Sequence, residues 1–182
     1  MRKKILDTAQ SQLGTAHLES SGIRGLIRSF LGKICQWMAM TRFPIGSKTR
    51  CRLERLRGVK IGKNVFLGGG NVLDRVRPDL ITIEDHVSIS GNVYILTHSN
   101  PTEPLRKIMG PESHVIEPVH IKRGAWIAVN VVILPGVTIG ENAIVAAGSV
   151  VMKDVADNTM VGVMPARFLK QIKPQQAVTD PD

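Results

Sequence analysis

The sequence predicts a solenoid of very short strands, and three observations lead to this fold class. First, aliphatic residues recur at every sixth position over residues 121–151. Second, the fourth residue after each of them is again small or aliphatic, from Ala125 to Val155. Third, a period of six fits neither the three-and-four spacing of an amphipathic helix nor the strict alternation of a lone strand. The six aliphatic residues are Ile121, Ile127, Ile133, Ile139, Val145 and Val151.

Each six-residue unit supplies one strand and one corner, so three units are expected to form a triangular coil. No single coil buries its apolar face alone, and stacked coils share one continuous core. The residue after the aliphatic position is often small, as in Gly62 and Gly140, which suits a tight corner. We therefore assign an all-β solenoid to residues 58–160. Upstream, the same period runs through Ile61, Leu67 and Leu73, and again through Ile83, Ile89 and Ile95.

A basic arm at residues 1–57 is predicted to precede the solenoid. Residues 1–63 hold 14 Lys and Arg against 3 Asp and Glu, whereas the remainder of the chain holds 10 against 12. Residues 1–20 show no period and are expected to be disordered or to form a short frayed helix. Between residues 22 and 41 apolar residues recur at three and four, which predicts an amphipathic basic helix.

Two roles remain open for this helix. It covers an end of the solenoid or a neighbouring subunit, or it binds a membrane surface, because apolar residues flanked by Lys and Arg suit an anionic interface. A nucleic-acid partner is not expected, because the nearby basic cluster has no interleaved aromatic residues and matches no known binding module. That cluster consists of Arg50, Arg52, Arg55 and Arg57.

Two interruptions of the period are expected to leave the coil. A small one at Arg75–Leu80 shifts the period by four residues. A larger one at residues 99–118 contains four prolines and is predicted to be a protruding loop, a feature that often lines the functional face of a solenoid. After the last coil, residues 161–182 are predicted to form a short helix through Ile172 and then a loose tail from Pro174.

Composition limits the class of protein. A chain of 182 residues that is 43% hydrophobic fits one domain with a small appendage. Cys35 and Cys51 lie outside the repeat and are predicted to be free thiols in a reducing cytoplasm. Polar residues follow the basic start where the apolar core of a signal peptide would stand. No apolar run reaches the roughly 20 residues of a spanning helix, so we expect a cytoplasmic protein, peripheral at most to the inner membrane surface.

The segment Ile-Gly-Glu-Asn-Ala-Ile-Val-Ala-Ala-Gly-Ser-Val-Val at residues 139–151 resembles the hexapeptide-repeat acyltransferases. The resemblance covers roughly residues 58–172 and implies a left-handed parallel β-helix. General rules for parallel crossovers would not predict that hand. The resemblance also implies acetyl coenzyme A as co-substrate, no metal, and a homotrimer with its three sites between subunits.

His98 is the candidate general base. It comes directly before the protruding loop, so we expect it at a rim where solvent, loop and neighbouring subunit meet. Imidazole titrates near working pH and can remove the proton of an acceptor hydroxyl. The segment 96–101 is similar to the catalytic-histidine stretch of galactoside, maltose and polysaccharide O-acetyltransferases. The resemblance therefore implies direct acetyl transfer to a sugar hydroxyl, in surface polysaccharide biosynthesis, without a covalent enzyme intermediate.

Four small or aromatic residues are implied to line the coenzyme A groove. Trp126 matches a family tryptophan near the acyl end, and Ala128 stands where relatives usually have Gly. Ala147 and Gly148 match positions where the backbone meets the pantetheine arm, although a packed corner explains Gly148 equally well.

Charged and polar residues complete the implied site. Lys153, Arg167 and Lys170 match basic residues near the nucleotide phosphates, with an exposed solvated face as the alternative. Related enzymes bind the acceptor through Asn and Asp from the coil before the catalytic histidine, and Asn71 and Asp74 are the nearest candidates here.

Three other functions stay open. The same base could serve an amine, so an N-acetyltransferase acting on a nucleotide-linked amino sugar is the close alternative. A noncatalytic trimer scaffold is the second. The third is a zinc enzyme like the gamma-class carbonic anhydrases, which share this β-helix and bind zinc through three histidines, two of them five residues apart. Here His114 and His120 are six apart, and no pair matches that spacing.

Overall fold

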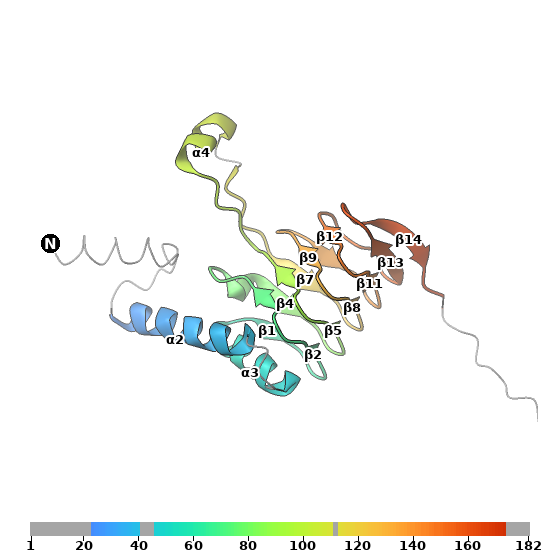
Figure 1. The fold of residues 1–182 in the computed structure, drawn as a ribbon, viewed down its shortest axis with the longest axis horizontal. Helices are drawn as coiled ribbons and strands as arrows, with labels where there is room; N and C mark the ends of the chain where they lie inside the picture. Colours follow the sequence, from blue (N-terminus) through green and yellow to red (C-terminus); the bar gives the residue numbers. More distant parts are fainter. Residues whose placement is uncertain (1–22, 41–45, 111–112, 174–182) are drawn as a thin grey trace, which may run out of the picture.

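The computed structural model describes residues 23–40, 46–110 and 113–173. It is a stack of coils with two helices at one end and a protrusion from one side (Figure 1). The predictions for residues 1–20 and for the tail from Pro174 lie outside the described residues.

Short strands form three walls, which we name A, B and C. The chain passes from wall A to B to C and back to A, and strands within a wall pair in parallel except for the last pair in wall B. The predicted solenoid is therefore confirmed. Wall A contains β1 (Lys60–Ile61), β4 (Ile81–Ile83), β7 (Val119–Ile121) and β10 (Thr138–Ile139). Wall B contains β2 (Phe66–Leu67), β5 (Ser88–Ile89), β8 (Trp126–Ile127), β11 (Ile144–Val145), β13 (Thr159–Gly162) and β14 (Arg167–Gln171). Wall C contains β3 (Val72–Leu73), β6 (Tyr94–Ile95), β9 (Val132–Ile133) and β12 (Val150–Val151).

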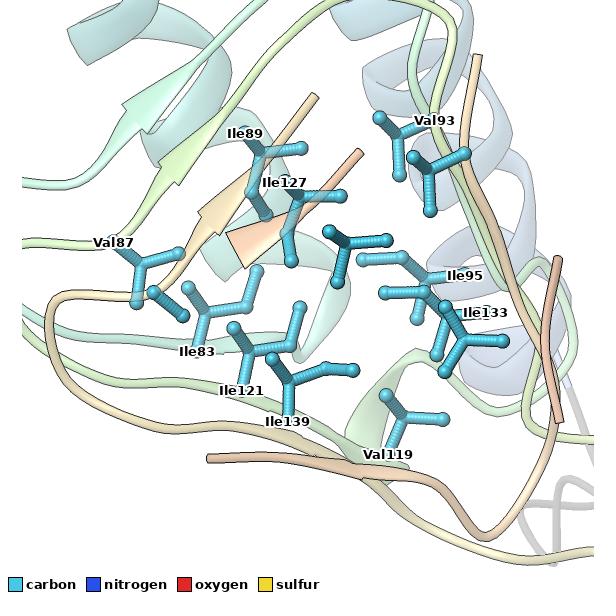
Figure 2. Packing of buried hydrophobic residues seen from close by; sticks show 14 of the residues in the cluster. Ile83, Val87, Ile89, Val93, Ile95, Val119, Ile121, Ile127, Ile133 and Ile139 are labelled. Atoms are coloured by element: carbon cyan, nitrogen blue, oxygen red, sulfur yellow. The ribbon is translucent and has the colours of Figure 1, made fainter. Parts of the chain in front are cut away.

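The predicted aliphatic positions point inward and stack between coils. Ile83, Ile121 and Ile139 lie along one wall, and Ile95 and Ile133 lie along another (Figure 2). All five side chains are at most 1% exposed. A two-residue strand has too few hydrogen bonds to persist alone, so this shared apolar column stabilises the coils.

The corners are built by two kinds of small residue. Directly after the aliphatic position, a Cβ on Gly140 would lie 2.5 Å from the Asp157 nitrogen in the next coil, so a larger side chain collides as predicted. Three residues after the aliphatic position, the backbone is left-handed, a conformation that Gly and Asn tolerate best and that the period alone did not indicate. The left-handed residues of the regular coils are Gly124, Asn130, Gly136, Asn142 and Gly148.

The strand pairings show which coils contain more or fewer than eighteen residues. Ile121 pairs with Ile139, 18 residues on, but Ile61 pairs with Ile83, 22 on, and Ile83 pairs with Ile121, 38 on. Val145 pairs with Val161, only 16 on. The extra residues follow β3 and β6, and the missing ones follow β12, so all three changes fall at the corner between walls C and A.

The two insertions differ in size. The first contains the short 3-10 helix η1 (Pro78–Leu80). The described residues of the second leave the coil as predicted and carry a helix within the expected loop, α4 (Glu103–Met109), at the tip of the protrusion (Figure 1).

Two helices cover the first coil. The helix α3 (Ser47–Arg57) contacts β1 and β2, and α2 (Ile23–Met40) packs against α3 (Figure 1). None of the helices in the described part of the chain is long and apolar enough to cross a membrane.

The predicted C-terminal helix is wrong. Residues 167–171 form β14, which pairs antiparallel with β13. Without β14, the last strand of wall B would expose unpaired backbone groups, and an added strand satisfies them. A helix of one or two turns has little stability of its own, so the open edge decides the conformation.

Candidate functional site

His98 lies at the base of the protrusion, at the corner between walls C and A. Its backbone forms an antiparallel bridge with Ile116, so the two legs of the protrusion are held together beside it. The Ser99 amide donates to the Val115 carbonyl at 2.9 Å, and the Val115 amide donates to the Ser99 hydroxyl at 2.8 Å. These bonds fix the backbone that carries the imidazole, whose side chain is 25% exposed.

Asp74 holds the His98 ring from inside the coil. Asp74 Oδ2 lies 2.6 Å from His98 Nδ1 and also accepts the Thr97 amide at 2.8 Å. Its other oxygen accepts the amides of Val76 at 2.7 Å and Arg77 at 3.1 Å. The Asp74 side chain has no exposed surface, so every contact of this carboxylate is with protein.

The hydrogen bonds keep Asp74 ionised. Burial alone would raise the pKa of Asp74, but the amides of Thr97 and Arg77, the His98 ring and the Val76 amide together lower it. An ionised carboxylate only accepts, so His98 Nδ1 donates. In a neutral imidazole, the lone pair then lies on Nε2. The pair thus presents Nε2 as a base at a partly exposed rim.

Helix α3 reaches the residues that lead into Asp74. Arg57 donates to the carbonyls of Leu73 at 3.2 Å and Asp74 at 2.6 Å, and it also pairs with Glu54. The Arg57 and Glu54 side chains are 3% and 1% exposed. Gln36 of α2 donates to the same Leu73 carbonyl at 3.2 Å. The arm therefore supports the backbone of the aspartate that orients His98.

The structure changes the predicted roles of Asn71 and Asp74. Both side chains are buried: Asn71 is 3% exposed, donates to the Gly68 carbonyl and accepts the Val93 amide. Asp74 contacts His98 instead. The period placed both residues in the coil before His98 but could not tell inward from outward side chains beside the first insertion.

The residues predicted to line a coenzyme A groove lie on wall B and its border with wall C. Trp126 projects from β8 and is 49% exposed, while its neighbour Ile127 is fully buried. Ala147 and Gly148 are exposed at the corner between walls B and C, and Ala128 lies at the same corner one coil earlier. Gly148 has the left-handed backbone of a turn, and no atom lies within 4 Å of where its Cβ would be. The turn explains the glycine, and the open space leaves room for a ligand.

The three predicted phosphate-binding cations are all exposed near the C-terminal end of the solenoid. Arg167 and Lys170 lie on β14. Lys153 follows β12, at the same corner as His98 but two coils further along.

One subunit does not bring these residues together. The corner between walls C and A lies opposite wall B in a three-walled coil, so His98 and Trp126 face away from each other across the core. Within one subunit, the core therefore separates the two side chains.

Two other histidines lie elsewhere on the solenoid. His86 occupies a left-handed turn position, and His120 Nε2 lies 2.6 Å from Glu84 Oε1 on wall A. Within residues 23–40, 46–110 and 113–173, no group of three His, Cys, Asp or Glu side chains could hold a metal ion. The zinc alternative therefore finds no ligand set in that part of the chain.

Comparisons with known proteins decide the family. Residues 110–153 match the bacterial transferase hexapeptide family of six repeats, and residues 58–97 match the hexapeptide repeat of succinyl-transferase. Protein CapG of Staphylococcus aureus is 40% identical over 120 residues, which cover 65% of this chain and 69% of that protein. The chain belongs to the hexapeptide-repeat acetyltransferases. Membership in this family supports the left-handed coil that the resemblance implied.

Other members of this family agree in sequence and fold. Galactoside O-acetyltransferase of Escherichia coli is 36% identical over 115 residues, which cover 63% of this chain and 54% of that enzyme. A hexapeptide-repeat acetyltransferase of Vibrio cholerae superposes with a TM-score of 0.65 at 28% identity over 85% of this chain and 96% of the other. A second structure of that protein, in complex with acetyl coenzyme A, gives a TM-score of 0.64 at 25% identity, covering 91% of this chain and 98% of the other.

The chain matches about half the length of several curated relatives. The aligned part spans 44% to 61% of the length of four curated relatives from fission yeast, budding yeast, Lactococcus lactis and Escherichia coli.

Proposed function

We propose that the protein is an acetyl coenzyme A-dependent O-acetyltransferase that acts on a sugar hydroxyl of a surface polysaccharide or its precursor. The observation that carries this proposal is the 2.6 Å contact between Asp74 Oδ2 and His98 Nδ1 at a partly exposed rim. Removing a hydroxyl proton needs an oriented base, and a buried carboxylate fixes the tautomer of the ring. The galactoside O-acetyltransferases among its relatives support a sugar as acceptor.

In the proposed reaction, acetyl coenzyme A supplies the acetyl thioester. His98 Nε2 takes the proton of the acceptor hydroxyl while the hydroxyl oxygen attacks the carbonyl carbon. The same nitrogen then gives this proton to the departing thiolate sulfur, so His98 ends the cycle neutral. Asp74 stabilises the imidazolium in between, because its carboxylate stays ionised beside Nδ1.

The exposed residues fit a long anionic ligand. The indole of Trp126 offers an apolar surface, and the open space at Gly148 admits a close approach to the backbone. Lys153, Arg167 and Lys170 are exposed cations at the same end of the solenoid and suit phosphate groups.

The proposed assembly is a homotrimer with its sites between subunits. His98 and Trp126 lie on opposite sides of the solenoid, so the proposed complete site takes His98 from one subunit and wall B from another.

The direct test uses the full chain with acetyl coenzyme A and a panel of sugars and amino sugars. Free thiol release and product mass are recorded for the wild type and for His98→Ala. We expect sugar-dependent release by the wild type and a loss of about 10²- to 10⁴-fold in His98→Ala, which is the usual worth of a general base.

A matched histidine controls for the substitution itself. His86→Asn changes a histidine at a turn position that Asn fills elsewhere, as at Asn64 and Asn142, so it should keep full activity. Release that depends on an amino sugar alone would indicate N-acetylation. Equal activity of His98→Ala and wild type would contradict the proposed base.

A further inference from the structure

The helix α2 turns its polar and small residues toward the protein. Gln36 and Ala39 are each 4% exposed, and Gln36 donates to the Leu73 carbonyl. An amphipathic helix that only covers a protein core packs its large apolar residues inward. Over residues 30–40, the side of α2 that packs on the protein is instead the side with little apolar surface.

Five large apolar residues in the described part of α2 are exposed, two of them strongly. Neighbours within this set are one, three or four residues apart along the described part of the helix, which places them on one face. Phe30 is 66% exposed and Trp37 is 71% exposed. The other residues of this face are Leu31 at 54%, Ile34 at 39% and Met38 at 38%. We call these five residues the outer face of α2.

Charge indicates what covers this face. The first 63 residues carry 14 basic and 3 acidic residues, whereas the rest of the chain carries 10 and 12. Lys48 and Arg52 are exposed on the adjacent α3. Anionic lipid attracts such a segment at about 1 kcal/mol for each Lys or Arg near the surface. A second copy of the arm would bring the same positive charge and would be repelled.

We propose that α2 lies in the plane of an anionic lipid surface and inserts its outer face between the headgroups. Trp and Phe suit this boundary, and a helix with one apolar face and a basic surround binds there without crossing the bilayer. Gln36, on the opposite side of the helix, would tie the first coil to the membrane through Leu73. This proposal does not depend on acetyl transfer.

Vesicle sedimentation of the full chain tests the proposal. Vesicles of phosphatidylcholine with phosphatidylglycerol are compared with vesicles of phosphatidylcholine alone, at low and high salt. We expect binding to the anionic vesicles that weakens with salt. The double variant Phe30→Ser/Trp37→Ser should lose about tenfold or more of this binding, because it removes two large side chains from lipid contact.

A second exposed apolar helix provides the matched control. Leu105 and Ile108 of α4 are 43% and 81% exposed, so Leu105→Ser/Ile108→Ser removes comparable apolar surface from another part of the molecule. This variant should bind anionic vesicles like the wild type. In Trp126→Phe, where Trp37 is the remaining tryptophan, emission should shift to the blue on binding.

Four results would overturn the proposal. Unchanged vesicle binding of Phe30→Ser/Trp37→Ser would show that the outer face does not contact lipid. An equal loss of vesicle binding in the α4 variant would show that the outer face has no special part in binding. An unshifted Trp37 emission would show the same by an independent readout. If the wild type ignored vesicles while Phe30→Ser/Trp37→Ser changed the oligomeric state by light scattering, a second copy of the chain would cover the face.

Discussion

At the scale of single residues, Asp74 is a negative charge with no exposed side-chain surface, held by three backbone amides and the His98 ring. Taking a carboxylate out of water is costly, and only several good hydrogen bonds offset that cost. The amides come from two successive coils at one corner, so the stacked coils keep Asp74 charged. The charge then sets which nitrogen of His98 carries the proton.

Asp74 should make the stability of the protein depend on pH in the acidic range. Its pKa is lowered in the folded state, so the unfolded state binds more protons as the pH falls. The stabilisation by Asp74 is therefore complete above the unfolded pKa of about 3.9 and is lost as the pH falls through the lower folded value. We expect wild type to unfold at higher urea than Asp74→Asn near pH 7, with the gap closing below about pH 4.

This prediction is checked by urea unfolding of both proteins at one protein concentration, between pH 3 and pH 7. A gap that stayed constant over this range would show that Asp74 contributes through shape alone and not through its charge.

The sequence predicted His98 but not its partner. The histidine comes directly before a break in the six-residue period, and such a break can be recognised from the sequence alone. Asp74 is 24 residues away, and the register that joins them depends on how many residues the first insertion holds. Side-chain direction beside an insertion follows from the path of the backbone, which no period describes.

At the scale of elements, α3 is joined to the corner that holds the catalytic candidates. Glu54 and Arg57 form a buried ion pair at the C-terminal end of this helix, and Arg57 also donates to the Leu73 and Asp74 carbonyls. Burial raises the pKa of Glu54, while Arg57 opposes that shift. The pair serves as a fixed connection between the arm and β3, because each charge needs the other inside the protein.

Removing one member of this pair should lower the free energy of unfolding far more than removing both. Arg57→Met leaves Glu54 buried without its cation and two carbonyls without a donor, so we expect a loss of about 3 to 5 kcal/mol in the free energy of unfolding. Glu54→Leu/Arg57→Met replaces both charges by apolar groups, so its free energy of unfolding should fall by clearly less. Denaturant unfolding measures the difference.

An exposed pair in the same molecule serves as the control. Lys107 and Glu103 of α4 are 75% and 70% exposed, so Lys107→Met should leave the free energy of unfolding nearly unchanged. If Arg57→Met were as mild as Lys107→Met, the connection between α3 and β3 would carry no stability.

Element types were predictable where a period ran long enough. The hexads predicted β1 to β12, and the three-and-four spacing of residues 22–41 matches the position of α2. The orientation of α2 was not predictable, since a period marks an apolar face without saying what lies against it. The last strand was missed because β14 forms in response to the open edge of β13, a contact made only in three dimensions.

At the scale of the whole molecule, the irregularities of the solenoid collect at one corner. The insertions after β3 and β6 and the shortened segment after β12 all join wall C to wall A. Asp74, His98 and Lys153 lie at this corner, where only the coil with Gly136 keeps the regular turn. Changes in one corner leave the stacked core intact, which is how a repeat fold gains a site without losing its stability.

Wall B of the same subunit lies on the far side of the core, so the proposed site can be tested by mixing subunits. His98→Ala keeps wall B intact, and Trp126→Ala keeps the His98 corner intact. When the two variants are co-expressed in equal amounts, a trimer has a complete site wherever His98 and Trp126 come from different variants in the right order. Random assembly gives about a quarter of wild-type acetyl transfer, well above the activity of either variant alone.

His98→Ala with Asp74→Asn is the control: both changes affect one corner of one subunit, so the acetyl transfer of this mixture should not exceed the mean of the two variants alone. Failure of the His98→Ala and Trp126→Ala mixture to gain activity, when each variant alone is trimeric and impaired, would mean that one subunit supplies both residues or that Trp126 is not part of the site.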